Sequence, residues 1–249
     1  MGQIRLFVES RLAAGGPLRL DGPQAHYLAT VMRRAVGDTV LVFNGQDGEW
    51  RARITAIGKG TATLTLEERT RAQRASPDLW LLAPVLKRET LEWMVEKATE
   101  LGVSRIVPVT TERSAVTRSN PQRLAAIARE AAEQCRRLDV PVVDEPAALA
   151  EVLAGWDGAR LLLLADESGA SPGLAAVIGG SIPAVPAPWA VLVGPEGGFA
   201  SRELDALRKL PFCRSVGLGP RILRAETAAL AALAVLQALA GDWRDHHVT

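Results

Sequence analysis

Two glycine-rich segments near the C-terminus hold the residue types most suited to chemistry. The first, Gly194-Pro195-Glu196-Gly197-Gly198-Phe199, follows an apolar run at residues 189–193 and precedes a predicted helix. The second, residues 218–227, also joins a predicted strand to a predicted helix. Glycines let the backbone approach a ligand closely, and ligands of parallel α/β sheets bind beyond the carboxyl ends of the strands. A plain tight turn would explain either segment alone, but two at successive strand ends indicate a ligand site.

The second segment mixes charge with apolar surface. Ile222 and Leu223 stand between Arg221 and Arg224, and Glu226 follows at the start of the predicted helix. Apolar side chains beside a few charged groups suit a pocket that grips an adenine and keeps charge near a reacting centre. The simpler interpretation is a surface ion pair ahead of a helix, in which Glu226 only interacts favourably with the helix dipole.

Other common sites are missing from the sequence. It has no GxxxxGK[ST] phosphate loop, no GxGxxG after a strand, no HExxH and no clustered cysteines and histidines, so ATP, NAD and metal sites lose their support. No apolar stretch reaches the roughly 18 residues of a membrane span, and residues 1–10 do not resemble a signal peptide. Cys135 and Cys213 are expected as reduced thiols. We therefore expect a cytoplasmic protein with no membrane segment and no metal.

The distribution of basic residues points to nucleic acid. Residues 1–74 carry 11 basic and 7 acidic side chains, although the whole chain is nearly neutral. Of the 29 basic residues, 25 are arginine, whose side chain suits phosphate and base stacking. A GC-rich genome would produce the same bias, so composition alone does not decide the partner.

The rhythm of the chain changes near residue 72. Before it, short strands broken by Asn44-Gly45 and Asp47-Gly48 surround one helix, which predicts a small β-barrel domain over residues 1–72. After it, strands alternate with helices, which predicts an α/β domain with a largely parallel sheet over residues 73–249. The expected strands are 4–8, 18–20, 39–43, 50–56, 61–66, 79–85, 105–109, 141–143, 161–165, 189–193 and 215–218, and the expected helices are 22–32, 89–101, 121–137, 201–210 and 226–240.

Taken together, the two glycine-rich segments resemble a known signature. Gly194-Pro195-Glu196-Gly197-Gly198-Phe199 with Leu218-Gly219-Pro220-Arg221-Ile222-Leu223-Arg224-Ala225-Glu226-Thr227-Ala228 is similar to the RsmE family, the ribosomal small-subunit RNA uracil-N3 methyltransferases of the SPOUT superfamily. Blocks at 26–33, 36–38, 93–103, 113–114 and 130–137 with Pro141 match the same family in the same order. Ala225 departs from the Thr or Ser expected there, a change that should leave the loop backbone intact.

This resemblance implies a fold, a reaction and partners. The implied fold is a PUA-like RNA-binding β-barrel over residues 1–72, followed by a SPOUT α/β methyltransferase domain with a deep trefoil knot over residues 73–249. The implied reaction is S-adenosylmethionine-dependent methylation of N3 of one uridine, position 1498 of 16S ribosomal RNA in the small subunit. A homodimer is also implied.

The chemistry of this implied reaction suggests roles for individual residues. Arg224 is expected to stabilise negative charge on the uracil, and Glu226 to accept the N3 proton or to orient that arginine, with Arg221 as a third catalytic residue. The expected cofactor-binding residues are Leu164, Gly194, Pro195, Glu196, Gly197, Gly198, Leu218, Gly219, Ile222, Leu223 and Thr227. The expected RNA-binding residues are Arg5, Arg33, Arg34, Lys87, Arg88, Lys97, Arg113, Arg136 and Arg137.

Two other functions remain open at this point. One is a ribose 2′-O-methyltransferase of the same superfamily, against which the matches at 93–103 and 130–137 count. The other is a non-catalytic RNA-binding assembly factor, which would be favoured by loss of the loop glycines or of Arg224 and Glu226. The sequence keeps all of these residues.

Overall fold

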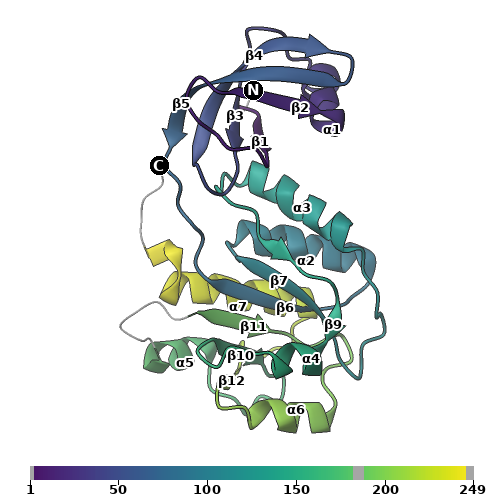
Figure 1. Cartoon of the computed structure of the whole chain (residues 1–249). Helices are drawn as coiled ribbons and strands as arrows, with labels where there is room; N and C mark the ends of the chain where they lie inside the picture. Colours follow the sequence, from purple (N-terminus) through teal and green to yellow (C-terminus); the bar gives the residue numbers. More distant parts are fainter. Residues whose placement is uncertain (1–2, 182–187, 245–249) are drawn as a thin grey trace. The chain divides into compact units, whose positions relative to one another are not determined.

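The chain folds into two compact units, shown in Figure 1. The computed structural model describes residues 3–181 and 188–244. One unit comprises the chain up to Ala75 together with Ala132–Val140, and the other comprises Ser76–Ala131 and the chain from Pro141 onward. The segment Ala132–Val140 lies outside residues 1–72, so the sequence-based division did not include it. Whether residues 1–72 form a separate folding domain stays a prediction.

The N-terminal unit is built on a five-stranded sheet. Its strands are β1 (Arg5–Phe7), β2 (Pro17–Asp21), β3 (Thr39–Phe43), β4 (Glu49–Gly58) and β5 (Thr61–Arg71), in the order β1-β3-β4-β5-β2. The β1–β3 pair is parallel and the other pairs are antiparallel. Alternate residues of these strands, such as Leu18 and Leu20, point into a common core. The predicted strand pattern is therefore confirmed.

The predicted helix between β2 and β3 is present but not uniform. It consists of α1 (Gly22–His26) and a wider π-helical turn, η1 (Tyr27–Val31). Ala25 and Leu28 are buried and join the core of the sheet. The chain leaves this helix through Arg33, whose φ of 51° lies in the left-handed region.

The second unit is an α/β layer structure with a wholly parallel sheet. Its strands are β6 (Leu79–Pro84), β7 (Arg105–Thr110), β8 (Val142–Val143), β9 (Ala147–Ala148), β10 (Leu161–Ala165), β11 (Trp189–Leu192) and β12 (Cys213–Val216). They lie in the order β12-β10-β11-β6-β7-β8, and β9 also pairs with β7. The helices are α2 (Arg88–Glu100), α3 (Pro121–Gln134), α4 (Leu149–Ala154), α5 (Leu174–Ser181), α6 (Ser201–Arg208) and α7 (Ala225–Ala240), with the short 3-10 turn η2 (Asp242–Arg244).

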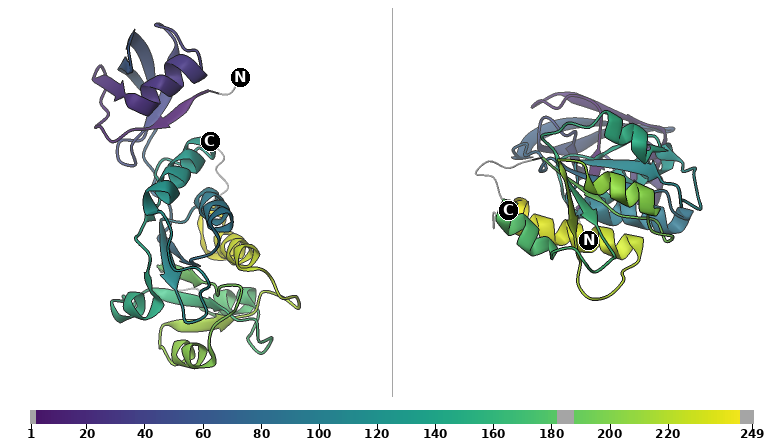
Figure 2. Two further views of the ribbon diagram at one scale, coloured as in Figure 1. Left: turned by 90° about the vertical axis from the view of Figure 1, so that its right-hand side faces the viewer. Right: turned by 90° about the horizontal axis from the view of Figure 1, so that it is seen from below.

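Helices cover both faces of this sheet (Figure 2). Leu162 and Leu164 pack in one cluster with apolar side chains of α4 and α6. Leu163 and Val191 are equally buried but point to the opposite face, because side chains alternate along a strand. On that face α7 packs against both α2 and α5. Burial on both faces explains why these strands read as continuous apolar runs.

The α/β alternation and parallel sheet predicted from the sequence are confirmed, with differences in detail. Helices α4 and α5 and the two-residue strand β9 were not predicted, and α3 ends at Gln134 rather than at residue 137. The knot implied by the resemblance stays a prediction. Among the described residues, no helix is long and apolar enough to cross a membrane.

Candidate functional site

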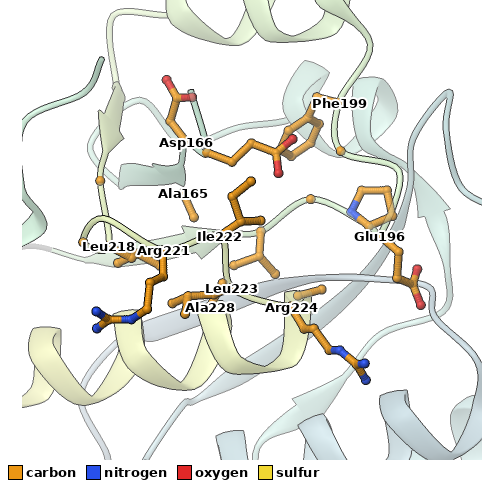
Figure 3. Close-up of a pocket in the computed structure, with 18 of the residues that line it drawn as sticks. Ala165, Asp166, Glu196, Phe199, Leu218, Arg221, Ile222, Leu223, Arg224 and Ala228 are labelled. Atoms are coloured by element: carbon orange, nitrogen blue, oxygen red, sulfur yellow. The ribbon is translucent and has the colours of Figure 1, made fainter. Parts of the chain in front are cut away.

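Three loops meet at one edge of the parallel sheet. They follow β10, β11 and β12, whose residues lie in register and whose carboxyl ends therefore share that edge. The loops enclose a cavity of about 920 Å³, shown in Figure 3. This volume is at the upper end of the range usual for small-molecule sites. The lining residues are Lys87, Thr90, Ala165, Asp166, Glu167, Gly169, Ser171, Gly173, Val193, Gly194, Pro195, Glu196, Gly198, Phe199, Leu204, Gly217, Leu218, Gly219, Pro220, Arg221, Ile222, Leu223, Arg224, Ala225, Glu226 and Ala228.

The loop after β11, residues 194–200, forms a tight backbone turn. The N–H of Gly198 donates to the carbonyl of Pro195 at 2.8 Å, and Gly198 has a φ of 64°, which favours glycine. A Cβ at Gly194 would lie 3.1 Å from the ring of Phe199. The glycines thus let this loop fold closely on itself, and its backbone groups face the cavity.

Side chains from outside hold this β11 loop in place. The carboxylate of Glu203 accepts the N–H of Ala200 at 3.0 Å and the N–H of Glu112 at 2.8 Å. Arg113 donates from Nη1 to the carbonyl of Gly197 at 3.1 Å. Arg202 also forms an ion pair with Glu112. The segment after β7 and the start of α6 therefore clamp the loop between them.

The loop after β12, residues 217–224, is held differently. Its base is fixed, because Gly217 accepts the N–H of Leu174 at 3.0 Å and donates to the carbonyl of Pro172 at 2.8 Å. Its tip is open: Ile222 is 80% exposed. Within the described part of the chain, the exposed side chains of Arg221 and Arg224 have no hydrogen bond or ion pair.

Charged residues stand at the start of α7, beside this open loop. Arg224 directly precedes the helix in an extended conformation, and its carbonyl accepts the N–H of Ala228 at 2.8 Å. Glu226 lies half-buried in the first helical turn, where the helix dipole favours a carboxylate. Both residues line the cavity. A cation and a carboxylate thus stand together at the start of α7, and Figure 3 shows Arg224 close to Leu223.

The third loop, residues 166–173 after β10, was not predicted as part of the site. Its first residue, Asp166, has a side chain only 1% exposed and accepts hydrogen bonds from Arg208 at 2.6 Å, the Ser171 hydroxyl at 2.8 Å and the Ser168 N–H at 2.9 Å. Burial alone would raise the pKa of Asp166, but these hydrogen bonds outweigh it and hold the pKa well below its usual range. Asp166 therefore stays ionised and joins this loop to α6.

The cavity brings together most of the residues expected to bind a cofactor or to catalyse. Arg221, Arg224 and Glu226 line it, as do Gly194, Pro195, Glu196, Gly198, Leu218, Gly219, Ile222 and Leu223. Three expected residues lie elsewhere. Leu164 points into the core beside α4 and α6, Gly197 faces Arg113, and Thr227 is exposed on another side of α7. The structure does not support a cofactor contact for these three.

Sequence reasoning missed several lining residues. Phe199 and Ala228 belong to the two signature segments but had no predicted role of their own, and Ala165 and Thr90 lie outside those segments. The polar, glycine-containing run Asp166-Glu167-Ser168-Gly169 follows a buried strand, which is the same signal that identified the other two loops. That rule, applied to a third strand, would have found the loop at 166–173.

The expected RNA contact at Arg5 is wrong. Arg5 is only 8% exposed, and its Nε donates to Glu49 at 2.6 Å. Its other nitrogens donate to the carbonyls of Ala132 and Glu133 at 3.0 and 2.9 Å and of Arg137 at 2.9 Å. Four of the five N–H donors of this buried guanidinium are used inside the protein, so it is not placed to bind phosphate. Arg5 holds the end of α3 to the N-terminal sheet.

The other expected RNA contacts fall into two groups. Lys97 pairs with Glu96 and Glu100, Arg88 pairs with Glu92, and Arg137 pairs with Asp139. These pairs give each cation a structural role that needs no RNA. The second group is accessible: Arg33, Lys87, Arg113 and Arg136 are exposed, and Arg34 is half-buried. RNA binding stays a prediction for both groups.

Known proteins resemble this chain over most of its length. A model of the RNA methyltransferase domain matches residues 74–237, and a model of the RNA methyltransferase PUA domain matches residues 20–67. The ribosomal RNA small subunit methyltransferase E of Rickettsia conorii is 33% identical over 236 residues, covering 94% of this chain and 95% of that protein. That of Bacillus subtilis is 28% identical over 244 residues, covering 93% and 95%.

Solved structures agree with these sequence matches. A ribosomal RNA small subunit methyltransferase E from Neisseria gonorrhoeae, bound to S-adenosyl methionine, superposes with a TM-score of 0.86 at 26% identity and covers 97% of this chain and 100% of its own. A Legionella pneumophila methyltransferase in complex with the bound cofactor SAM gives a TM-score of 0.85 at 30% identity, with the same coverage. The chain therefore belongs to the RNA methyltransferase family and, within it, to the ribosomal RNA small subunit methyltransferases E.

Proposed function

We propose that this chain uses S-adenosylmethionine to methylate N3 of one uridine in 16S ribosomal RNA, the position called 1498 by the resemblance. The observation that carries the proposal is the cavity at three strand ends, which is lined both by a clamped backbone loop and by Arg224 and Glu226. Family membership indicates the methyl donor and the RNA substrate. Arg224 and Glu226 favour a methyl acceptor that must lose a proton, such as the N3–H of uracil.

The residues present fit the cofactor. Ile222, Leu223 and Phe199 offer apolar surface for an adenine, and the turn at Gly194 and Gly198 offers backbone groups at close range. When bound there, S-adenosylmethionine supplies an electrophilic methyl group on a positively charged sulfur. The protein's own task is to align the acceptor nitrogen with that group and to keep water out.

The acceptor nitrogen sets a second task. Uracil N3 carries a proton at neutral pH, and it becomes a good nucleophile only as that proton leaves. We assign Glu226 to accept the proton, because its carboxylate lines the cavity in the first turn of α7. We assign Arg224 to stabilise the negative charge that remains on the base. Arg221 lines the same wall and is a further candidate for this stabilisation.

The finer expectations about partners belong to the same proposal. We propose that the enzyme works in the cytoplasm as a homodimer and acts on ribosomal RNA within the small subunit. The family resemblance supports these statements. Sedimentation of the purified chain tests the dimer independently of catalysis, since a monomer at micromolar concentration would contradict it.

The reaction is tested on small subunits that lack the modification. A methyl group on N3 blocks Watson–Crick pairing, so incubation with the protein and S-adenosylmethionine should create a stop for reverse transcriptase at one uridine. Nucleoside analysis of the same RNA should show 3-methyluridine. Ribose methylation instead would establish a 2′-O-methyltransferase. RNA binding without any methylation would establish a non-catalytic assembly factor.

The same assay tests Glu226. We expect Glu226→Gln to lower the single-turnover rate by about 10²-fold, a usual loss for a removed general base. Cofactor and RNA affinities should stay unchanged, because glutamine keeps the size and polarity of the side chain. A Glu226→Gln variant that methylates at the wild-type rate would remove this carboxylate from the chemistry.

A further inference from the structure

Lys87 lines the same cavity as Arg224 and Glu226 but comes from a different strand. It follows β6, the neighbour of β11 in the sheet, and directly precedes α2. The sequence alone suggested a phosphate contact for Lys87. Its place in the cavity points instead to the reacting base.

Because α2 packs against α7, Lys87 lines the cavity from the helix next to the one that carries Glu226. The two helices contact one another, and near their C-terminal ends Gln237 donates to the carbonyl of Leu101 at 2.6 Å. Their N-terminal ends both open on the cavity, α2 through Lys87 and Thr90 and α7 through Arg224 and Glu226. Lys87 and Arg224 each directly precede their helix, so the two cations occupy equivalent positions on adjacent parallel helices.

Within the described chain, the acidic residues of α2 form no ion pair with Lys87. Glu89, in the first turn of the helix, is exposed and has no ion pair with any described residue. Glu92 pairs with Arg88 at 2.7 Å and also with Arg123 at 3.5 Å. Glu96 and Glu100 pair with Lys97. Within residues 3–181 and 188–244, the exposed ammonium group of Lys87 has no ion pair or hydrogen bond. Its three N–H donors are therefore available to a ligand.

The hydrogen-bonding edge of uracil matches the charges of Lys87, Arg224 and Glu226. That edge presents an acceptor at O4, a donor at N3–H and an acceptor at O2. Lys87 and Arg224 are donors, and Glu226 is an acceptor. Cytosine presents a donor at N4 and no proton at N3, so it would oppose one cation with a donor and leave the carboxylate without a partner. An unpaired polar group in a closed site strongly disfavours the wrong ligand.

We propose that Lys87 is a specificity-determining and catalytic residue that donates to one uracil carbonyl while Arg224 donates to the other. The inference rests on the proposed function. As the N3–H bond breaks, the proton moves to the carboxylate of Glu226 and the electron pair stays on the base, where it spreads over O2 and O4. Lys87 and Arg224 then stabilise this charge from two sides, which favours loss of the proton.

The test separates a base contact from a phosphate contact. Single-turnover methylation of unmodified small subunits is measured at saturating protein and cofactor over a range of pH, and RNA affinity is measured over a range of salt. We expect Lys87→Met to lower the saturated rate by about 10²-fold and to shift the rise of rate with pH upward by about one unit. Lys87→Arg should recover most of the rate, because a cation is restored.

The matched control is Arg123→Met. Arg123 is an exposed arginine of α3 that also pairs with Glu92 and does not line the cavity. Its saturated rate should stay within about twofold of wild type, the range expected for an exposed pair. Nucleoside analysis of the wild-type product shows separately whether 3-methyluridine forms.

Two results would overturn the inference. The first is a Lys87→Met variant with a wild-type saturated rate and a salt dependence of RNA binding reduced by about one charge, which is the signature of a phosphate contact. The second is a slower variant with an unshifted pH profile, which indicates a structural role. If the wild-type protein forms no 3-methyluridine, the proposed function fails as well. If the wild-type protein does form 3-methyluridine and either result appears, only the inference about Lys87 fails.

Discussion

The loops that follow β11 and β12 line one cavity but are held in opposite ways. The β11 loop is clamped by Glu203 and Arg113, which bind its backbone from outside the cavity. The β12 loop is fixed only at its base, and Ile222 and the guanidinium of Arg224 extend from it without a partner in the described chain. One loop therefore offers a preformed backbone surface, and the other offers side chains that a ligand can engage.

This difference indicates a division of work. A cradle for a cofactor benefits from rigidity, because a preorganised site loses less conformational entropy on binding. Charged groups that act on a substrate must instead be available until the substrate arrives. We therefore assign cofactor affinity mainly to the clamped loop and the chemical step mainly to Arg224 and Glu226 at the end of the open loop.

The largest effect is expected at Arg224. Arg224→Gln removes the cation but keeps a polar side chain of similar reach, so the single-turnover rate should fall by about 10²- to 10³-fold, as for other groups that stabilise a developing anion. Cofactor affinity, measured by calorimetry, should stay within twofold. Arg244→Gln, an exposed arginine outside the cavity, is the control and should be indistinguishable from wild type. A rate loss below about threefold for Arg224→Gln would place the charge stabilisation elsewhere.

A smaller effect, on stability, is expected at Asp166 in the third loop. Asp166→Asn removes the charge that receives Arg208, Ser171 and the Ser168 N–H. Hydrogen bonds to a charged group each contribute roughly 1.5–3 kcal/mol, so the free energy of unfolding in urea should fall by about 2 kcal/mol at neutral pH. An unchanged midpoint would show that Arg208 does not stabilise this loop.

The effect at Asp166 should depend on pH with a defined sign. Because the folded protein holds the pKa of Asp166 below its unfolded value, the stabilisation is fully present above about pH 4, the usual pKa of an aspartate, and is lost as the pH falls through the folded pKa. The stability difference between wild type and Asp166→Asn should therefore be constant from about pH 5 to 7 and should shrink below pH 4. A difference that grew on acidification would contradict the assignment.

The smallest effect is expected at Arg113, in the clamp. Arg113→Met loses one hydrogen bond to the carbonyl of Gly197 on an exposed surface, so cofactor affinity should fall by about two- to fivefold. The saturated methylation rate and the salt dependence of RNA binding should not change. A salt dependence reduced by about one charge would instead support the phosphate contact that the sequence suggested for Arg113.

Local patterns were enough to predict much of this arrangement. Buried strands with glycines at their ends located the loops after β11 and β12 and, with them, Arg224 and Glu226. The loop at 166–173 was missed although it carries the same signal, since it has no arginine beside its carboxylates. The helices α4 and α5 are short, at six and eight residues, and α5 begins after a polar turn with no capping pattern.

The remaining errors concern contacts between distant parts of the sequence. Arg5 was expected on RNA, but its partner Glu49 and the carbonyls of Ala132 and Glu133 lie far along the chain. Leu164 stands at the end of β10, yet strand alternation turns its side chain toward α4 and α6. Lys87 lines the same cavity as Arg224 because α2 packs on α7, a contact that periodicity does not reveal.

The most direct test of the division of work measures cofactor affinity and the saturated methylation rate side by side in Arg113→Met and Arg224→Gln. We predict that the two variants are affected in opposite ways. Arg113→Met should bind S-adenosylmethionine more weakly and methylate normally at saturation, whereas Arg224→Gln should bind it normally and methylate at least about 10²-fold more slowly. If Arg224→Gln lost affinity as much as rate, or if Arg113→Met lost rate at saturating cofactor, the two loops would act as one undivided site and the account would be contradicted.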